Sequence, residues 1–163
     1  MQTLCLNACL EANIESRPLS QKNLPSDDSF LRKVCVISSV TTDFGSAVGK
    51  IKEGPKQRGS SRISYRLSDG STRDVYPIIL KALALDPPQL NHRYQQLNDR
   101  IKQVCANESP VGSTVTGACV HIAEIVNNFL NRQILEWDSD NDVLDIRDPY
   151  FLFYLRWSSV LDT

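Results

Sequence analysis

The stretch QILEWDSDNDVLDIRDPYFLFYLRW, residues 133–157, carries the strongest fold signal in the chain. Residues 134–137 and 143–146 are two short runs rich in apolar and β-forming residues. The five residues between them, 138–142, are all Asp, Ser or Asn, which bond to their own backbone and tolerate bent conformations. Two such runs joined by a short polar link predict a β-hairpin.

A short helix is predicted directly after this hairpin. Asp148 is a favourable N-cap residue, and Pro149 fits the first helical position, where its missing N–H costs no hydrogen bond. Residues 150–157 then form the most hydrophobic segment of the chain. Because aromatic side chains bury a large apolar area, we expect this segment to pack the hairpin onto the elements that precede it.

Length and composition indicate an ordinary globular protein. The chain has 163 residues, enough for one domain with a sizeable core and an appended N-terminal segment. Its hydrophobic content is 41%, its charged content is 23%, and its net charge is −1. The charge is unevenly spread, because residues 110–163 contain three Lys or Arg and eight Asp or Glu. The C-terminal third is therefore acidic and the rest of the chain is mildly basic.

The cysteines and the N-terminus predict a cytoplasmic protein. There are five cysteines, an odd number, and their spacing matches neither a disulfide framework nor a zinc site. Residues 1–15 lack the basic start of a secretory signal. No apolar run approaches the length of a bilayer span, so we expect no membrane association.

Residues 1–60 are predicted to form an irregular N-terminal extension or arm. Residues 34–40, VCVISSV, indicate one possible strand, although the sequence does not show its partner in a sheet. Residues 43–61 contain five Gly or Pro together with several cations, which is typical of a mobile loop. The domain boundary is therefore placed near residue 60.

Residues 61–163 are predicted to form an α+β domain of the winged-helix type. Residues 62–67 alternate between polar and apolar, as a half-buried strand does. Apolar residues at helical spacing then predict three helices, over residues 75–83, 86–105 and 113–131. A strand, three helices, a hairpin and a short helix make a winged helix, which is a variant of the helix-turn-helix. In that arrangement the first strand pairs with the hairpin, whose turn is the tip of the wing.

The residues WD…VLDIRDPYFLFYLRW within this stretch also resemble a known class of domain. They are similar to the closing segment of winged-helix domains that end some multidomain signalling ATPases. The resemblance covers about residues 62–158 and concerns the fold alone. It implies a winged helix, and no functional motif comes with it.

A winged helix raises the hypothesis of nucleic-acid binding through the exposed face of its third helix. Phosphate contacts require Lys or Arg, and the third helix offers only Arg132 as a reliable cation. The stronger basic patch lies earlier in the chain and consists of Lys50, Lys52, Lys56, Arg58, Arg62 and Arg66. This patch is either a phosphate-contacting arm or a solvated loop.

The motifs for metal binding are incomplete. Asp138, Asp140 and Asp142 have the spacing that opens an EF-hand calcium loop. Val143 stands where that loop needs Gly, and Pro149 stands where it needs a bidentate Glu. We therefore interpret these aspartates as the hairpin turn and expect no metal or other cofactor.

Catalysis has few candidate residues. His121 lies two residues from Cys119, so on a helix the two side chains point to different faces. His92, the second histidine, is expected on the polar side of the helix over residues 86–105. A hydrolase or transferase would need one of these histidines beside a cysteine or carboxylate in a pocket. We predict that the chain is not an enzyme.

These features favour a non-catalytic winged-helix module for protein interaction or regulation. Its predicted contact residues are Asp138, Asp140 and Asp142 at the wing tip and Asn127 and Asn128 on the third helix. A protein partner or self-association is expected. The alternative is a nucleic-acid-binding regulator of transcription or defence, which would bind DNA through the basic patch at residues 50–66 together with the third helix.

Overall fold

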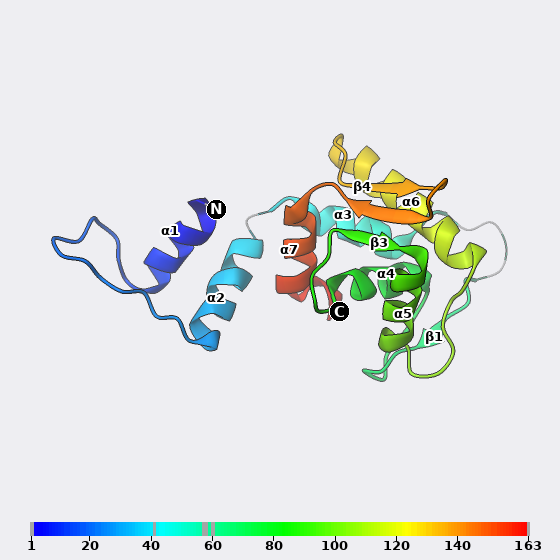
Figure 1. Ribbon diagram of the computed structural model, residues 1–163, viewed down its shortest axis with the longest axis horizontal. Helices are drawn as coiled ribbons and strands as arrows, with labels where there is room; N and C mark the ends of the chain where they lie inside the picture. The colour runs from blue at the N-terminus through cyan, green and yellow to red at the C-terminus, as the bar shows by residue number, and fades with distance from the viewer. Residues whose placement is uncertain (1, 41, 57–58, 60, 163) are drawn as a thin grey trace.

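The computed structural model describes residues 2–40, 42–56, 59 and 61–162. Seven α-helices and two small antiparallel sheets make up this described part of the chain (Figure 1). In Figure 1, α1 and α2 lie at one end of the molecule, and the three-stranded sheet lies among the later helices. The elements in chain order are α1 (Gln2–Glu11), α2 (Asp28–Ser39), α3 (Phe44–Glu53), β1 (Tyr65–Arg66), β2 (Thr72–Arg73), α4 (Val75–Ala84), β3 (Asn91–Arg93), α5 (Tyr94–Val104), α6 (Ser113–Leu130), β4 (Leu135–Asp138), β5 (Val143–Ile146), α7 (Pro149–Trp157) and a 3₁₀ turn (Ser159–Leu161).

The predicted strand VCVISSV is wrong, because these residues form the C-terminal part of α2 and the residue that follows it. Asp27 caps this helix, since its carboxylate accepts a hydrogen bond from Phe30 N at 3.0 Å. Val34 and Ser38, one helical turn apart, are buried, whereas Val36 between them is exposed. The buried positions therefore follow a helical spacing, and the β-branched composition of the segment concealed it.

The N-terminal extension is helical rather than irregular. α1 has no buried residue and packs on α2, which in turn packs on α7. Asn7 Nδ2 on α1 donates a hydrogen bond to Ser38 Oγ on α2 at 2.9 Å. Lys33 and Glu11 form an ion pair between the same two helices.

The predicted mobile loop at residues 43–61 contains helix α3. The apolar residues Phe44, Ala47, Val48 and Ile51 follow the spacing of one helix face, and all four are buried. Gly54 ends the helix in a backbone conformation with a φ of 63°. The four buried residues belong to the same hydrophobic core as α4, α6 and α7. α3 therefore shares its core with residues beyond the predicted boundary near residue 60.

The first strand does not pair with the C-terminal hairpin. Only Tyr65 and Arg66 form β1, and this strand pairs with β2 across the turn at residues 69–70. The next residue, Leu67, bridges to Cys105 at the end of α5. The strand that joins the hairpin is β3, which pairs antiparallel with β5. The order in this three-stranded sheet is β3-β5-β4, with β5 in the centre.

β3 replaces the first part of the helix predicted over residues 86–105, and α5 begins only at Tyr94. Arg100 on α5 contacts the end of α4, because its guanidinium donates a hydrogen bond to the carbonyl oxygen of Leu85 at 2.8 Å. His92 is fully buried in β3 rather than exposed on a helix. Its Nε2 lies 3.1 Å from the carbonyl oxygen of Gln89, which can only accept, so Nε2 carries the proton. Within the described residues, His92 Nδ1 has no hydrogen-bond partner.

Acid is expected to destabilise the protein through His92. Burial, helped by the charge of Arg100, lowers the pKa of His92 from 6.5 to about 4. The unfolded chain binds a proton near pH 6.5 that the folded protein binds only near pH 4, so protonation favours unfolding. The free energy of unfolding should fall by about 3 kcal/mol as the pH drops between these two values.

Urea denaturation across this pH range measures that loss. A His92→Gln variant should lose most of the pH dependence, whereas His121→Gln should keep it, because His121 is exposed. An equal pH dependence in all three proteins would contradict the assignment of the effect to His92.

The predicted hairpin and C-terminal helix are confirmed, and so is the α+β class. β4 and β5 pair antiparallel over their full length. Asp148 accepts a hydrogen bond from Tyr150 N at 2.9 Å, and Pro149 is the first residue of α7. Phe151 on α7 packs edge-on against Phe44 on α3, with ring centroids 5.4 Å apart. The C-terminal helix thus joins the hairpin to the core, as its aromatic content predicted.

Candidate protein-binding groove

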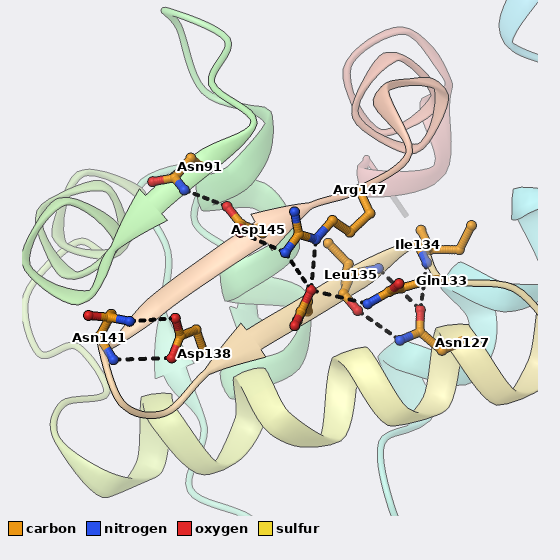
Figure 2. Close-up of polar contacts among 10 residues, drawn as sticks. Asn91, Asn127, Gln133, Ile134, Leu135, Asp138, Asn141, Asp145 and Arg147 are labelled. Carbon is orange, nitrogen blue, oxygen red and sulfur yellow. Dashed lines mark hydrogen bonds and ion pairs between the residues drawn. The ribbon is translucent and has the colours of Figure 1, made fainter.

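The turn between β4 and β5 is ordered by Asp138. Its carboxylate accepts hydrogen bonds from Asn141 N at 3.2 Å and from Asn141 Nδ2 at 2.7 Å (Figure 2), and from Asp140 N at 2.9 Å. The bond from the Asn141 side chain and those from backbone N–H groups lower the pKa of Asp138. Asp140 and Asp142 are both exposed. The tip of the hairpin therefore presents a fixed, negatively charged surface.

Asn127 joins α6 to the start of β4. Its Oδ1 accepts hydrogen bonds from Ile134 N at 2.7 Å and from Leu135 N at 3.1 Å (Figure 2). Its Nδ2 donates to the carbonyl oxygen of Leu135 at 2.7 Å. Asn127 thus holds the hairpin against α6, whereas Asn128, the next residue, is exposed.

A groove of about 320 Å³ lies between α6 and β4. Its lining includes Asn127 and Asn128, which were predicted as contact residues, together with residues that were not predicted. Its lining comprises Val120, Ala123, Glu124, Asn127 and Asn128 from α6, and Gln133, Leu135, Glu136 and Trp137 from β4 and the residues before it. The one available signal in the sequence was Trp137, a large aromatic residue in a predicted hairpin strand.

The charges around this groove are mainly negative. Glu136 is paired, since its carboxylate accepts hydrogen bonds from Arg147 Nε at 2.7 Å and from Gln133 Nε2 at 3.1 Å. Arg147 also contacts Asp145, at 3.3 Å. Glu124 is exposed on α6, and no ion-pair partner for it is found among the described residues. Glu124 therefore contributes to the groove a negative charge that is unpaired among the described residues, and the acidic turn follows directly after the last lining residue, Trp137.

The basic patch at residues 50–66 is not one flexible arm. Lys50 and Lys52 lie on helix α3. Lys50 pairs with Glu53 at 2.9 Å, and Lys52 Nζ donates to the carbonyl oxygen of Val160 at 3.0 Å. The first two cations of the patch are therefore placed by a folded helix that belongs to the core.

Arg62 links the end of α3 and the residues after it to the start of α4 through hydrogen bonds and an ion pair. Its guanidinium pairs with Asp74 at 2.6 Å and donates to the carbonyl oxygens of Glu53 at 3.0 Å and of Pro55 at 2.5 Å. It also lies over the ring of Tyr76, 4.8 Å from the ring centroid. These contacts give Arg62 a structural role.

The remaining predicted cations are scattered. Lys56 and Arg66 are exposed, and Arg58 lies outside the described residues. Arg132, just after α6, pairs with Asp43 at 2.8 Å and lies over the ring of Phe44 at 5.2 Å. Of the described cations, Lys50, Arg62 and Arg132 are each paired with a carboxylate.

A second pocket, of about 310 Å³, lies between α4 and the first half of α6. Tyr76 Oη lies 3.1 Å from His121 Nδ1 in its wall. Among the described residues, neither histidine is hydrogen-bonded to a cysteine or a carboxylate. Cys119 is fully buried, and burial raises the pKa of its thiol to about 12, which leaves almost no reactive thiolate.

Within the described residues, no group of three or more His, Cys, Asp or Glu side chains is arranged to hold a metal ion. None of the described helices has both the length and the apolar character needed to cross a membrane.

No family model matches the sequence, and neither curated proteins nor solved structures gave a match. The groove and the charges around it are therefore the basis on which a function can be inferred.

Proposed function

We propose that this chain is a non-catalytic winged-helix module that binds or regulates another protein. The order α4, β3, α5, α6, β4 and β5 supports the fold assignment. In a winged helix, a strand between the first and second helices joins the hairpin sheet, and β3 joins β5 in this way. α6 then takes the place of the third helix, and the acidic turn takes the place of the wing tip.

The charge of α6 is the observation that carries the proposed role. All residues of α6 are described, and they include no Lys or Arg. Apart from His121, the one ionisable side chain with a formal charge is Glu124. The hairpin tip adds the three aspartates. Because binding to the nucleic-acid backbone depends on cations, this face is suited to a protein rather than to DNA.

The groove supplies the apolar contacts that a protein partner requires. Val120 on α6 is 37% exposed, and Trp137 on β4, which also lines the groove, is partly exposed. Aromatic residues are enriched at the centres of protein interfaces, where they bury much area at a low cost in side-chain entropy. The groove therefore combines apolar side chains with polar and acidic ones.

Titration of the full chain against labelled duplex and single-stranded DNA, at low and at physiological salt, tests this proposal. We expect no complex with either nucleic acid, because α6 itself has no Lys or Arg and Arg132, just after it, is paired with Asp43. A complex that weakens steeply with salt would contradict the proposal. Loss of that complex when Lys50, Lys52, Lys56 and Arg58 are changed to Ala would then favour the regulator that binds nucleic acid.

A charge-reversed variant provides the matched control. Changing Glu124→Lys and Asn128→Lys places two cations on the exposed face of α6 without altering a buried residue. This variant should gain weak, salt-sensitive affinity for duplex DNA, because it replaces the carboxylate on α6 and adds two cations that can contact phosphates. If it gains none, charge is not what keeps this face from DNA.

A further inference from the structure

β4 lies at the border of the three-stranded sheet, so one of its two sides has no neighbouring strand. Both the N–H and the carbonyl of Leu135 are directed to Asn127, away from β5. In an antiparallel pair, the backbone groups of every second residue face the same side. The N–H and carbonyl of Trp137, two residues on, therefore also face away from β5. No partner for these two groups is found among the described residues.

Asn127 occupies the position of a neighbouring strand at one point on this edge. Its amide donates one hydrogen bond to Leu135 and accepts one from it, as a residue of a paired strand would. Beyond Asn127, the space between α6 and β4 opens into the groove lined by Val120, Ala123 and Trp137. Trp137, whose two backbone groups are unpaired within the described residues, is thus one of the residues that line this groove.

The negative charges near this edge of β4 favour a binding partner with basic side chains. Glu124 lines the groove on the α6 side. Asp138 directly follows Trp137 at the end of β4, where the acidic hairpin turn begins. The pKa of Asp138 is lowered, in line with a side chain that stays ionised. An extended segment with Lys or Arg side chains would thus meet carboxylates on both sides while its backbone met the free edge of β4.

We propose that the groove between α6 and β4 binds an extended, basic segment of a partner protein, which adds to the sheet as a strand beside Trp137. Such a segment would donate to the Trp137 carbonyl and accept from the Trp137 N–H, extending the order β3-β5-β4 by one strand. The inference rests on the proposed protein-binding function and specifies the chemistry of the partner.

A fluorescein-labelled peptide of alternating residues, Lys-Val-Lys-Val-Lys-Val-Lys, is the probe. We expect the full chain to bind it at physiological salt, as measured by fluorescence anisotropy. Two N-methylated versions block the two edges of the peptide separately, one through the valine amides and the other through the lysine amides. One version should lose at least about tenfold in affinity and the other should bind normally, because only one edge pairs with β4.

Protein variants test the charge. Glu124→Lys should weaken peptide binding several-fold, whereas Glu108→Lys, at an exposed site outside the groove, should not. Absence of binding by the unmodified peptide, or equal binding by both N-methylated versions, overturns strand addition. If binding is equal for both versions but still sensitive to Glu124→Lys, the groove remains a protein-binding surface. Failure of the proposed function itself would appear instead as salt-sensitive DNA binding by the unaltered chain.

Discussion

Replacing Asn127 with alanine is expected to lower the free energy of unfolding by about 4 kcal/mol. The Asn127 amide is the partner of three backbone groups, the N–H groups of Ile134 and Leu135 and the carbonyl of Leu135. Because Ile134 and Leu135 are fully buried, these groups would lose their partner without gaining water in its place. Urea denaturation followed by circular dichroism measures the loss.

The adjacent residue provides a close control. Asn128→Ala should change the free energy of unfolding by less than about 0.5 kcal/mol, because Asn128 is exposed. The loss of unfolding free energy in Asn127→Asp should lie between the losses in the two alanine variants. The aspartate keeps an acceptor for the two N–H groups but loses the donor to the Leu135 carbonyl. Equal, small effects of the two alanine substitutions would show that Asn127 does not hold the hairpin.

Phe44→Ala is expected to cost a similar amount, about 4 kcal/mol. Phe44 is 1% exposed and packs against Phe151 and Tyr154 of α7, with ring centroids 5.4 and 5.9 Å away. Its removal would leave a cavity where α3 meets α7, and the packed helices around it can close that cavity only in part.

Phe129→Ala is the matched control for this substitution, because Phe129 is 48% exposed on α6. It should cost much less than Phe44→Ala in the same denaturation experiment. If both variants were nearly as stable as the parent, α3 would be an appended arm, and the sequence-based boundary near residue 60 would be the better description.

The C-terminal part of the fold could be predicted from the sequence because its signals are local. The turn residues at 138–142 lie between two β-rich runs, and Asp148 and Pro149 mark the start of a helix. α6 was also predicted, since its buried residues recur at helical spacing. The signal for each of these elements lies within the element itself or in the few residues next to it in the sequence.

The N-terminal half was less predictable because composition and spacing disagree there. The segment VCVISSV has the β-branched residues of a strand, but its buried positions are four residues apart. Gly45 and Gly49 suggested a loop, although the apolar stripe of α3 runs between and beyond them. In both places the tertiary contacts with α7 and α6 outweigh weak local preferences.

β3 was missed for a related reason. A strand of three residues, Asn91–Arg93, carries too little periodicity to be told from the start of a helix. His92 appeared polar in the sequence, yet the pairing of β3 with β5 buries it completely. The candidate site was recognised only in part, because the open edge at Trp137 depends on which strand lies at the border of the sheet.

The most direct test of the proposed function is a map of backbone amide shifts in the ¹⁵N-labelled full chain, titrated in parallel with the Lys–Val peptide and with duplex DNA. We predict that the peptide shifts the amides of Trp137 and of residues 120–124 on α6, and that DNA shifts neither set. Shifts on α6 and α3 caused by DNA and suppressed by salt, with none caused by the peptide, would contradict the assignment of this face to a protein partner.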